Sequence, residues 1–324
     1  MSSCIMANAD QILSLIKSHL EGDDERFRSL ALQVSVSEAK AGHVVLARAI
    51  KDLLNTNKMR VLRPQMKMLN SDISELLIEI EQPFRLSDLV INDSLKEKIN
   101  RIIKEYIQRD KLRKYNLDNR RKVLMTGPSG TGKTMTASVI GNELNLPLYV
   151  VRLEKIVTKF MGETSMKLSK VFDWITQMQG VYLFDEFDAI GQQRGLDNEV
   201  GEMRRVLNSF LQMMERDTSD SLILAATNDV QALDKALFRR FDDVLEYSLP
   251  SDEEKIEIVK RKLNGFALKG DIYSLLPSME YMSHAEICMV CTDAIKEVLL
   301  YNEDLTVALI KRIISMRTKA YNAV

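Results

Sequence analysis

The chain has 324 residues, which is enough for two or three domains. Its 45 Lys and Arg balance 46 Asp and Glu, and the net charge of −1 argues against a general nucleic-acid coat or a polybasic membrane binder. A hydrophobic content of 45% with 28% charged residues excludes general disorder. No apolar run reaches the roughly 18 residues of a membrane span, and the N-terminus lacks a secretory signal pattern. Three Cys favour a reducing, cytoplasmic location.

Residues 1–56 are expected to form a small helical bundle. Their apolar residues recur at steps of three and four in three stripes, which begin at Ile12, Phe27 and Val44. Three short amphipathic helices can bury these stripes only against one another, so a bundle is the simplest arrangement. Residues 57–82 have a mixed composition and are expected to be a linker, with an extended piece at Leu76–Ile80.

Residues 83–250 alternate short apolar runs with helix-length segments. Each run has four to six residues and little polar alternation, which is typical of a parallel sheet covered on both faces. The five runs are Val123–Thr126, Leu148–Leu153, Val181–Phe184, Leu222–Ala226 and Val244–Ser248. The pattern predicts an α/β domain, and residues 251–324 are predicted to be helical throughout.

A glycine-rich segment directly follows the first of these runs and directly precedes a helical stretch. It reads Gly127-Pro128-Ser129-Gly130-Thr131-Gly132-Lys133-Thr134 and matches the pattern G-x-x-x-x-G-K-[ST]. Glycines let backbone N–H groups surround phosphate oxygens, and the following helix N-terminus adds partial positive charge. Lys133 is expected to reach the β and γ phosphates, and the Thr134 hydroxyl to ligate Mg²⁺. The segment therefore predicts a P-loop nucleotide site.

The apolar run Val181–Phe184 ends in a pair of carboxylates, Asp185 and Glu186. A strand of a parallel sheet would place both side chains at its carboxyl edge, where ligands bind in open α/β folds. Asp185 is expected to hold Mg²⁺ through its water shell. Glu186 is expected to orient and deprotonate the attacking water.

These motifs, together with Leu224–Asn228 and Leu233–Asp242, resemble an AAA ATPase in order and spacing over about residues 83–324. The double arginine before Phe241 makes the motif pattern most similar to that of the katanin and spastin branch. With a single ATPase module, the chain also resembles bacterial single-module members of the family. The resemblance implies a large α/β domain at 83–250 and a small helical lid at 251–324. It implies ATP and Mg²⁺ as cofactors, and nucleotide contacts that extend to Met135 and Ala285.

The resemblance also assigns roles outside the phosphate loop. Asn228 corresponds to sensor 1, which helps to place the lytic water. Arg239 and Arg240 correspond to arginine fingers, which enter the neighbouring subunit's site and stabilise charge on the γ phosphate. A homo-oligomeric ring or spiral would then be required, and the resemblance implies six subunits, as is usual in the family. His284 stands where many relatives have Gly beside the nucleotide.

Lys159, Phe160 and Met161 resemble the central pore loop of the family, in which an exposed aromatic grips an extended peptide. The resemblance favours an ATP-driven protein remodeller that pulls polypeptides through a pore. The N-terminal bundle would recruit a client or adaptor. The chain carries no H-E-x-x-H, so any proteolysis would need a separate protein.

The alternative hypothesis is a nucleic-acid remodeller or loader built on the same ring. The segment 96–122, which has 11 basic and 4 acidic residues, could attract a polyanion. An apolar stripe runs through this segment, so a solvated helix face is favoured. A contact between subunits and a contact with nucleic acid stay open as other interpretations.

Overall fold

The computed structural model describes residues 24–40, 71–156, 161–187, 197–229 and 238–322, with a few isolated positions between 13 and 50. The chain divides into two compact units, Met1–Arg63 and Pro64–Val324. In the first unit, helix α2 (Asp24–Lys40) buries Ala31 and Val34, and the Ser35 hydroxyl donates to the carbonyl of Ala47 at 2.8 Å. Most of the first and third predicted helices lie outside the described residues, so the bundle stays a prediction.

The second unit contains a six-stranded sheet with the order β1-β3-β4-β5-β2-β6. Strands β2 to β6 are parallel to one another, and β1 is antiparallel to β3. The strands are β1 (Leu77–Ile80), β2 (Lys122–Thr126), β3 (Leu148–Val151), β4 (Val181–Phe184), β5 (Leu222–Thr227) and β6 (Asp243–Glu246). The α/β class with a covered, mostly parallel sheet is therefore confirmed.

Strand β1 lies inside the segment 57–82 that was expected to be a linker. It is an edge strand in which only Leu77 is buried, whereas Ile78 and Ile80 are exposed. Strands with one buried residue carry almost no hydrophobic pattern, so the sequence indicates an extended piece there but not its place in the sheet. The residues Leu77–Ile80 belong structurally to the α/β layer.

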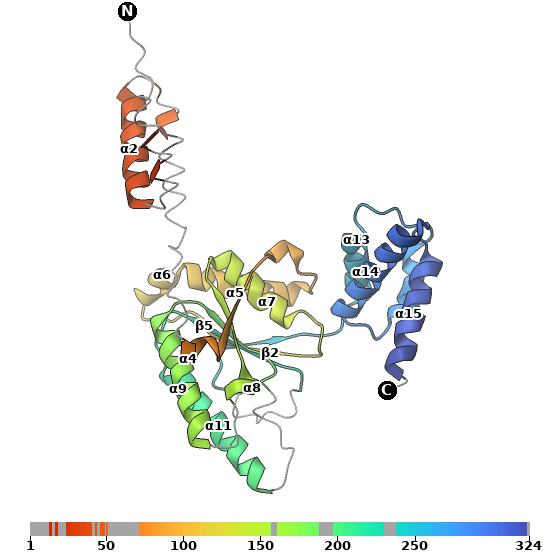
Figure 1. Ribbon diagram of the computed structural model, residues 1–324. Helices are drawn as coiled ribbons and strands as arrows, with labels where there is room; N and C mark the ends of the chain where they lie inside the picture. The colour runs from red at the N-terminus through yellow and green to blue at the C-terminus, as the bar shows by residue number, and fades with distance from the viewer. Residues whose placement is uncertain are drawn as a thin grey trace, which may run out of the picture. The chain divides into compact units, whose positions relative to one another are not determined.

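Helices cover both faces of the sheet, as Figure 1 shows, with α5 and α7 on one side and α4, α9 and α11 on the other. The strands alternate accordingly: Leu124 and Phe184 pack with Phe172 of α9, while Met125 and Leu183 belong to the other core. The helices are α4 (Ser71–Ser74), η2 (Leu86–Asp88), α5 (Asp93–Ile107), α6 (Arg109–Arg113), α7 (Lys133–Leu144), α8 (Leu153–Ile156), α9 (Met161–Gln177) and α11 (Asp197–Arg216).

The C-terminal part is helical, as predicted, and has its own core. It consists of α13 (Asp252–Lys262), η3 (Ile272–Met279), α14 (His284–Tyr301) and α15 (Val307–Asn322). Val259, Leu275, Ile287 and Ile310 are all completely or almost completely buried in that core. Within the part of the chain that is described, no helix is long and apolar enough to cross a membrane.

Candidate nucleotide site

The glycine-rich segment forms the turn between β2 and α7, at the carboxyl edge of the sheet. Gly127, Gly130 and Gly132 all have positive φ, at 139°, 73° and 102°, where a side chain would be strained. A Cβ at Gly127 would lie 2.2 Å from the carbonyl oxygen of Tyr247. Glycine at these positions therefore lets the loop keep this path without backbone strain or a steric clash.

Lys133 begins helix α7 and is buried in the loop. Its ammonium group donates to the carbonyl oxygens of Gly127 at 2.7 Å and Pro128 at 2.8 Å. It also donates to the side-chain oxygen of Asn228 at 2.8 Å. Two motifs that lie 95 residues apart in sequence, the phosphate loop and the end of β5, thus meet at one positive charge.

A second pair of predicted residues meets beside this lysine. The Thr134 hydroxyl donates to a carboxylate oxygen of Asp185 at 2.8 Å, which joins the start of α7 to the end of β4. Hydroxyl and carboxylate oxygens are the donors that Mg²⁺ prefers. The donor set therefore fits the metal for which both residues were selected from the sequence.

Glu186 lies in a turn that exposes its carboxylate. Its φ of 51° is unusual for a residue other than glycine, and its N–H donates to Asp185 at 2.9 Å. The next residue, Phe187, is completely buried and packs against the ring of Phe210 at 4.8 Å. Burial of Phe187 anchors the turn, so Glu186 faces a cavity of about 370 Å³ that Asp185 and Arg152 also line.

The start of helix α14 lies directly on the phosphate loop. The N–H of Ala285 donates to the carbonyl of Gly130 at 3.0 Å. A Cβ on Gly130 would lie 2.7 Å from the hydroxyl of Ser283, so this glycine is also needed for close approach. Ser283 was not among the site residues predicted from the sequence, although the capping-box pattern Ser283-His284-Ala285-Glu286 is visible there.

The remaining predicted residues lie at different places. Met135 is partly buried against the core under α5 and α7. Arg239 and Arg240 are exposed in the turn before β6, and Arg240 forms an ion pair with Glu215 of α11. Lys159 and Phe160 lie outside the described residues, and Met161 begins α9.

The sheet and the glycine-rich loop define a P-loop nucleotide-binding protein. The profile of the ATPase family associated with various cellular activities (AAA) matches residues 123–249. An uncharacterised AAA family ATPase of Sinorhizobium fredii is 32% identical over 301 residues, which cover 91% of this chain and 90% of the relative. The chain belongs to the AAA ATPase family, and it binds and hydrolyses ATP.

Other relatives match over a smaller part of their length. A proteasome-activating nucleotidase of Methanococcus maripaludis is 35% identical over 53% of this chain and 44% of its own. The ATP-dependent zinc metalloprotease FtsH of Mycoplasma mobile is 31% identical over 58% of this chain and 28% of its own length. The chain thus spans less than half the length of these two. The crystal structure of the FIGL-1 AAA domain is similar in fold, with a TM-score of 0.61 at 21% identity over 81% of this chain and 97% of that domain.

Proposed function

We propose that this ATPase is a protein remodeller that acts as a ring or spiral of subunits, six by family habit, and pulls polypeptides through a central pore. The relatives named for proteasome activation and for proteolysis support a protein client. The resemblance of Lys159, Phe160 and Met161 to a pore loop supports the threading step.

The observation that carries the oligomeric part is the position of the arginine pair relative to the subunit's own phosphate loop. Strand β6 is parallel to β2, with Asp243 paired to Val123 and Glu246 paired to Thr126. Arg239 and Arg240 precede β6, whereas the loop follows β2. The arginines therefore lie at the opposite edge of the sheet from the loop of their own subunit. They can assist hydrolysis only in a neighbouring subunit, which requires a head-to-tail assembly.

Within one subunit, different side chains would have different roles in ATP hydrolysis. Lys133 would exchange its loop carbonyls for phosphate oxygens of ATP and keep Asn228 within reach of the γ phosphate. Thr134 and Asp185 would hold Mg²⁺, which supplies charge neutralisation between the phosphates. Glu186 would take the proton of the attacking water.

The proposal gives the two units different roles. Met1–Arg63 would recruit a client or adaptor, and the α/β and helical domains would hydrolyse ATP. We also propose a separately encoded protease as a partner and the cytoplasm as the location. The basic segment 96–122 does not favour nucleic acid, because Arg113, Arg120 and Arg121 form ion pairs with carboxylates of the same subunit.

The Glu186→Gln variant of the full chain tests this proposal. With ATP it should bind nucleotide but hydrolyse it at least about 100-fold more slowly, because the base is gone. It should therefore hold polypeptides that mass spectrometry can identify after a pull-down. The matched double variant Glu186→Gln/Phe160→Ala should bind ATP equally well and hold far less polypeptide. Capture of nuclease-sensitive material in place of polypeptide, or equal capture by the double variant, would contradict the remodeller proposal.

A further inference from the structure

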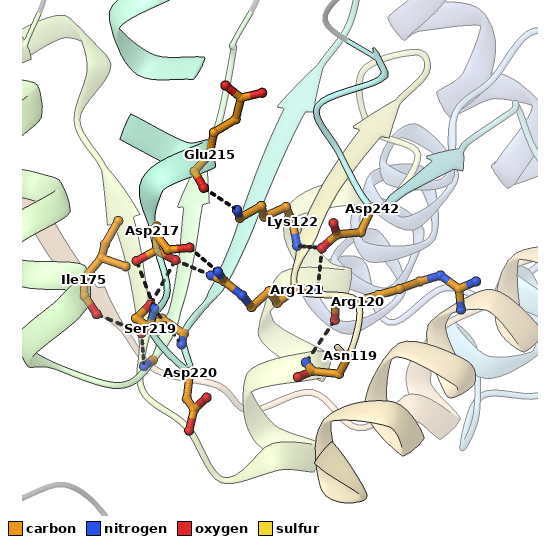
Figure 2. A network of polar contacts seen from close by, with 12 residues as sticks. Asn119, Arg120, Arg121, Lys122, Ile175, Glu215, Asp217, Ser219, Asp220 and Asp242 are labelled. Atoms are coloured by element: carbon orange, nitrogen blue, oxygen red, sulfur yellow. Dashed lines mark hydrogen bonds and ion pairs between the residues drawn. The ribbon is translucent and has the colours of Figure 1, made fainter. Parts of the chain in front are cut away.

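A network of ion pairs and hydrogen bonds surrounds the start of β2 (Figure 2), and the phosphate loop follows the other end of this strand. It joins three segments that are distant in sequence: the start of β2, the end of α11 and the turn that carries the arginine pair. Asp242 ends the segment Leu233–Asp242 that carries the family resemblance, but Glu215 and Asp217 were not selected from the sequence. The proposed chemistry of hydrolysis uses none of these three carboxylates. Its contacts fix the position of the turn that carries Arg239 and Arg240.

The end of α11 is fixed to the start of β2. Asp217 is almost completely buried and accepts hydrogen bonds from the Arg121 guanidinium and from the Ser219 hydroxyl, the latter at 3.1 Å. Two residues earlier, the carbonyl of Glu215 accepts from the ammonium group of Lys122 at 3.5 Å. The main chain at Glu215 is thereby held beside β2 while its carboxylate stays exposed.

The turn before β6 is fixed to the same two residues of β2. The Asp242 carboxylate accepts from the backbone N–H groups of Arg121 and Lys122, both at 2.9 Å. The N–H of Asp242 donates in return to the carbonyl of Lys122 at 2.7 Å. Phe241 is buried in the core. The arginine pair is therefore anchored immediately on its C-terminal side.

These two anchors bring Glu215 and Arg240 together. Their ion pair is accessible, with 41% of the glutamate side chain and 46% of the arginine side chain exposed. Arg239 is also exposed, but it has no ion-pair or hydrogen-bond partner in the described part of the chain. The structure thus separates two arginines that are equivalent in sequence: one is engaged within its own subunit and the other is available.

We infer that Glu215 is a positioning residue for hydrolysis: it holds Arg240 within its own subunit, so that Arg239 is the arginine presented to the neighbouring subunit's phosphates. This inference rests on the proposed function, in which an arginine acts between subunits. An exposed ion pair adds little to stability, so its main effect is to orient the turn.

The test is a charge swap in the full-length oligomer, with kcat and KM for ATP as the readouts. Arg240→Glu places two carboxylates together and should lower kcat by at least about 5-fold, because the turn is displaced. Adding Glu215→Arg recreates the pair in reverse and should bring kcat back to within about twofold of the wild type, with KM unchanged. Arg239→Ala should lower kcat by about 10³-fold.

A milder variant keeps the test valid if the swap does not fold. Glu215→Gln should lower kcat about 2–5-fold without changing KM, while Glu97→Gln, the same change at an exposed position of α5, should have no effect. A folded swap variant that stays as slow as Arg240→Glu would overturn the inference, because Arg240 itself would then be required. Wild-type kcat in Arg239→Ala would also overturn the inference, whereas wild-type kcat in the double variant Arg239→Ala/Arg240→Ala would contradict the proposed action between subunits.

Discussion

Protonation of His284 should affect the contact between the start of α14 and the phosphate loop. It lines a small cavity together with Thr131 of the loop, Tyr247 and Glu254. Burial lowers the pKa of His284 below the ordinary value of 6.5, and the Glu254 carboxylate opposes this shift. The neutral imidazole is therefore the form that the folded protein favours.

A pH dependence of stability follows from this shift. Because the pKa of His284 is lower in the folded chain than in the unfolded chain, the stabilising contribution of the neutral form is complete above pH 6.5. It is lost as the pH falls through the pKa of the folded state. Thermal unfolding between pH 8 and pH 5 should show this acid loss in the wild type, and His284→Asn should reduce it. An identical pH dependence in both proteins would show that His284 does not titrate on unfolding.

Two helices of the C-terminal part begin with the same capping box but have different neighbours. Ser251 caps α13 and Ser283 caps α14, each accepting from the N–H of a glutamate three residues later. Only Ser283 also lies against the phosphate loop, where its hydroxyl limits the space at Gly130. Stability and nucleotide affinity should therefore respond differently at these two caps.

Alanine substitution separates these effects. Ser251→Ala and Ser283→Ala should each cost about 1 kcal/mol of stability, because an N-cap hydrogen bond is lost. Only Ser283→Ala should also weaken ATP binding, since it loosens the start of α14 where Ala285 donates to Gly130. Unfolding and equilibrium binding of a fluorescent ATP analogue measure the two quantities. Equal losses of affinity in the two variants would contradict a specific link between α14 and the loop.

At the level of elements, the sequence predicted those strands and site residues that depend on short-range patterns. Strands β2 to β5 are almost completely buried and read as apolar runs. The loop and Asp185 follow directly from motifs. Strand β1 could not be predicted with its place in the sheet, because its pairing with β3 is a long-range contact. The ion pair between Glu215 and Arg240 was missed for the same reason, since a helix end and a turn 25 residues later carry no common local signal.

In the whole molecule, the central feature is that the phosphate loop and the proposed arginine fingers lie at opposite edges of one sheet. The phosphate loop, Asp185 and Asn228 gather at the carboxyl edge of the parallel strands, and the arginine turn lies at the other edge. A single subunit cannot bring these parts together without breaking the register of β2 and β6. Catalysis is therefore expected to depend on assembly, and the ATPase rate per subunit on protein concentration.

Mixing two inactive variants tests this claim most directly. Lys133→Ala lacks a working loop and Arg239→Ala lacks the arginine, so neither should hydrolyse ATP at an appreciable rate alone. In an equimolar mixture, about a quarter of the interfaces of a head-to-tail ring pair an intact loop with an intact arginine. We predict that hydrolysis recovers to about a quarter of the wild-type rate at that ratio and falls on either side of it. A mixture that is no more active than the two variants measured separately, at every ratio, would contradict an active site shared between subunits.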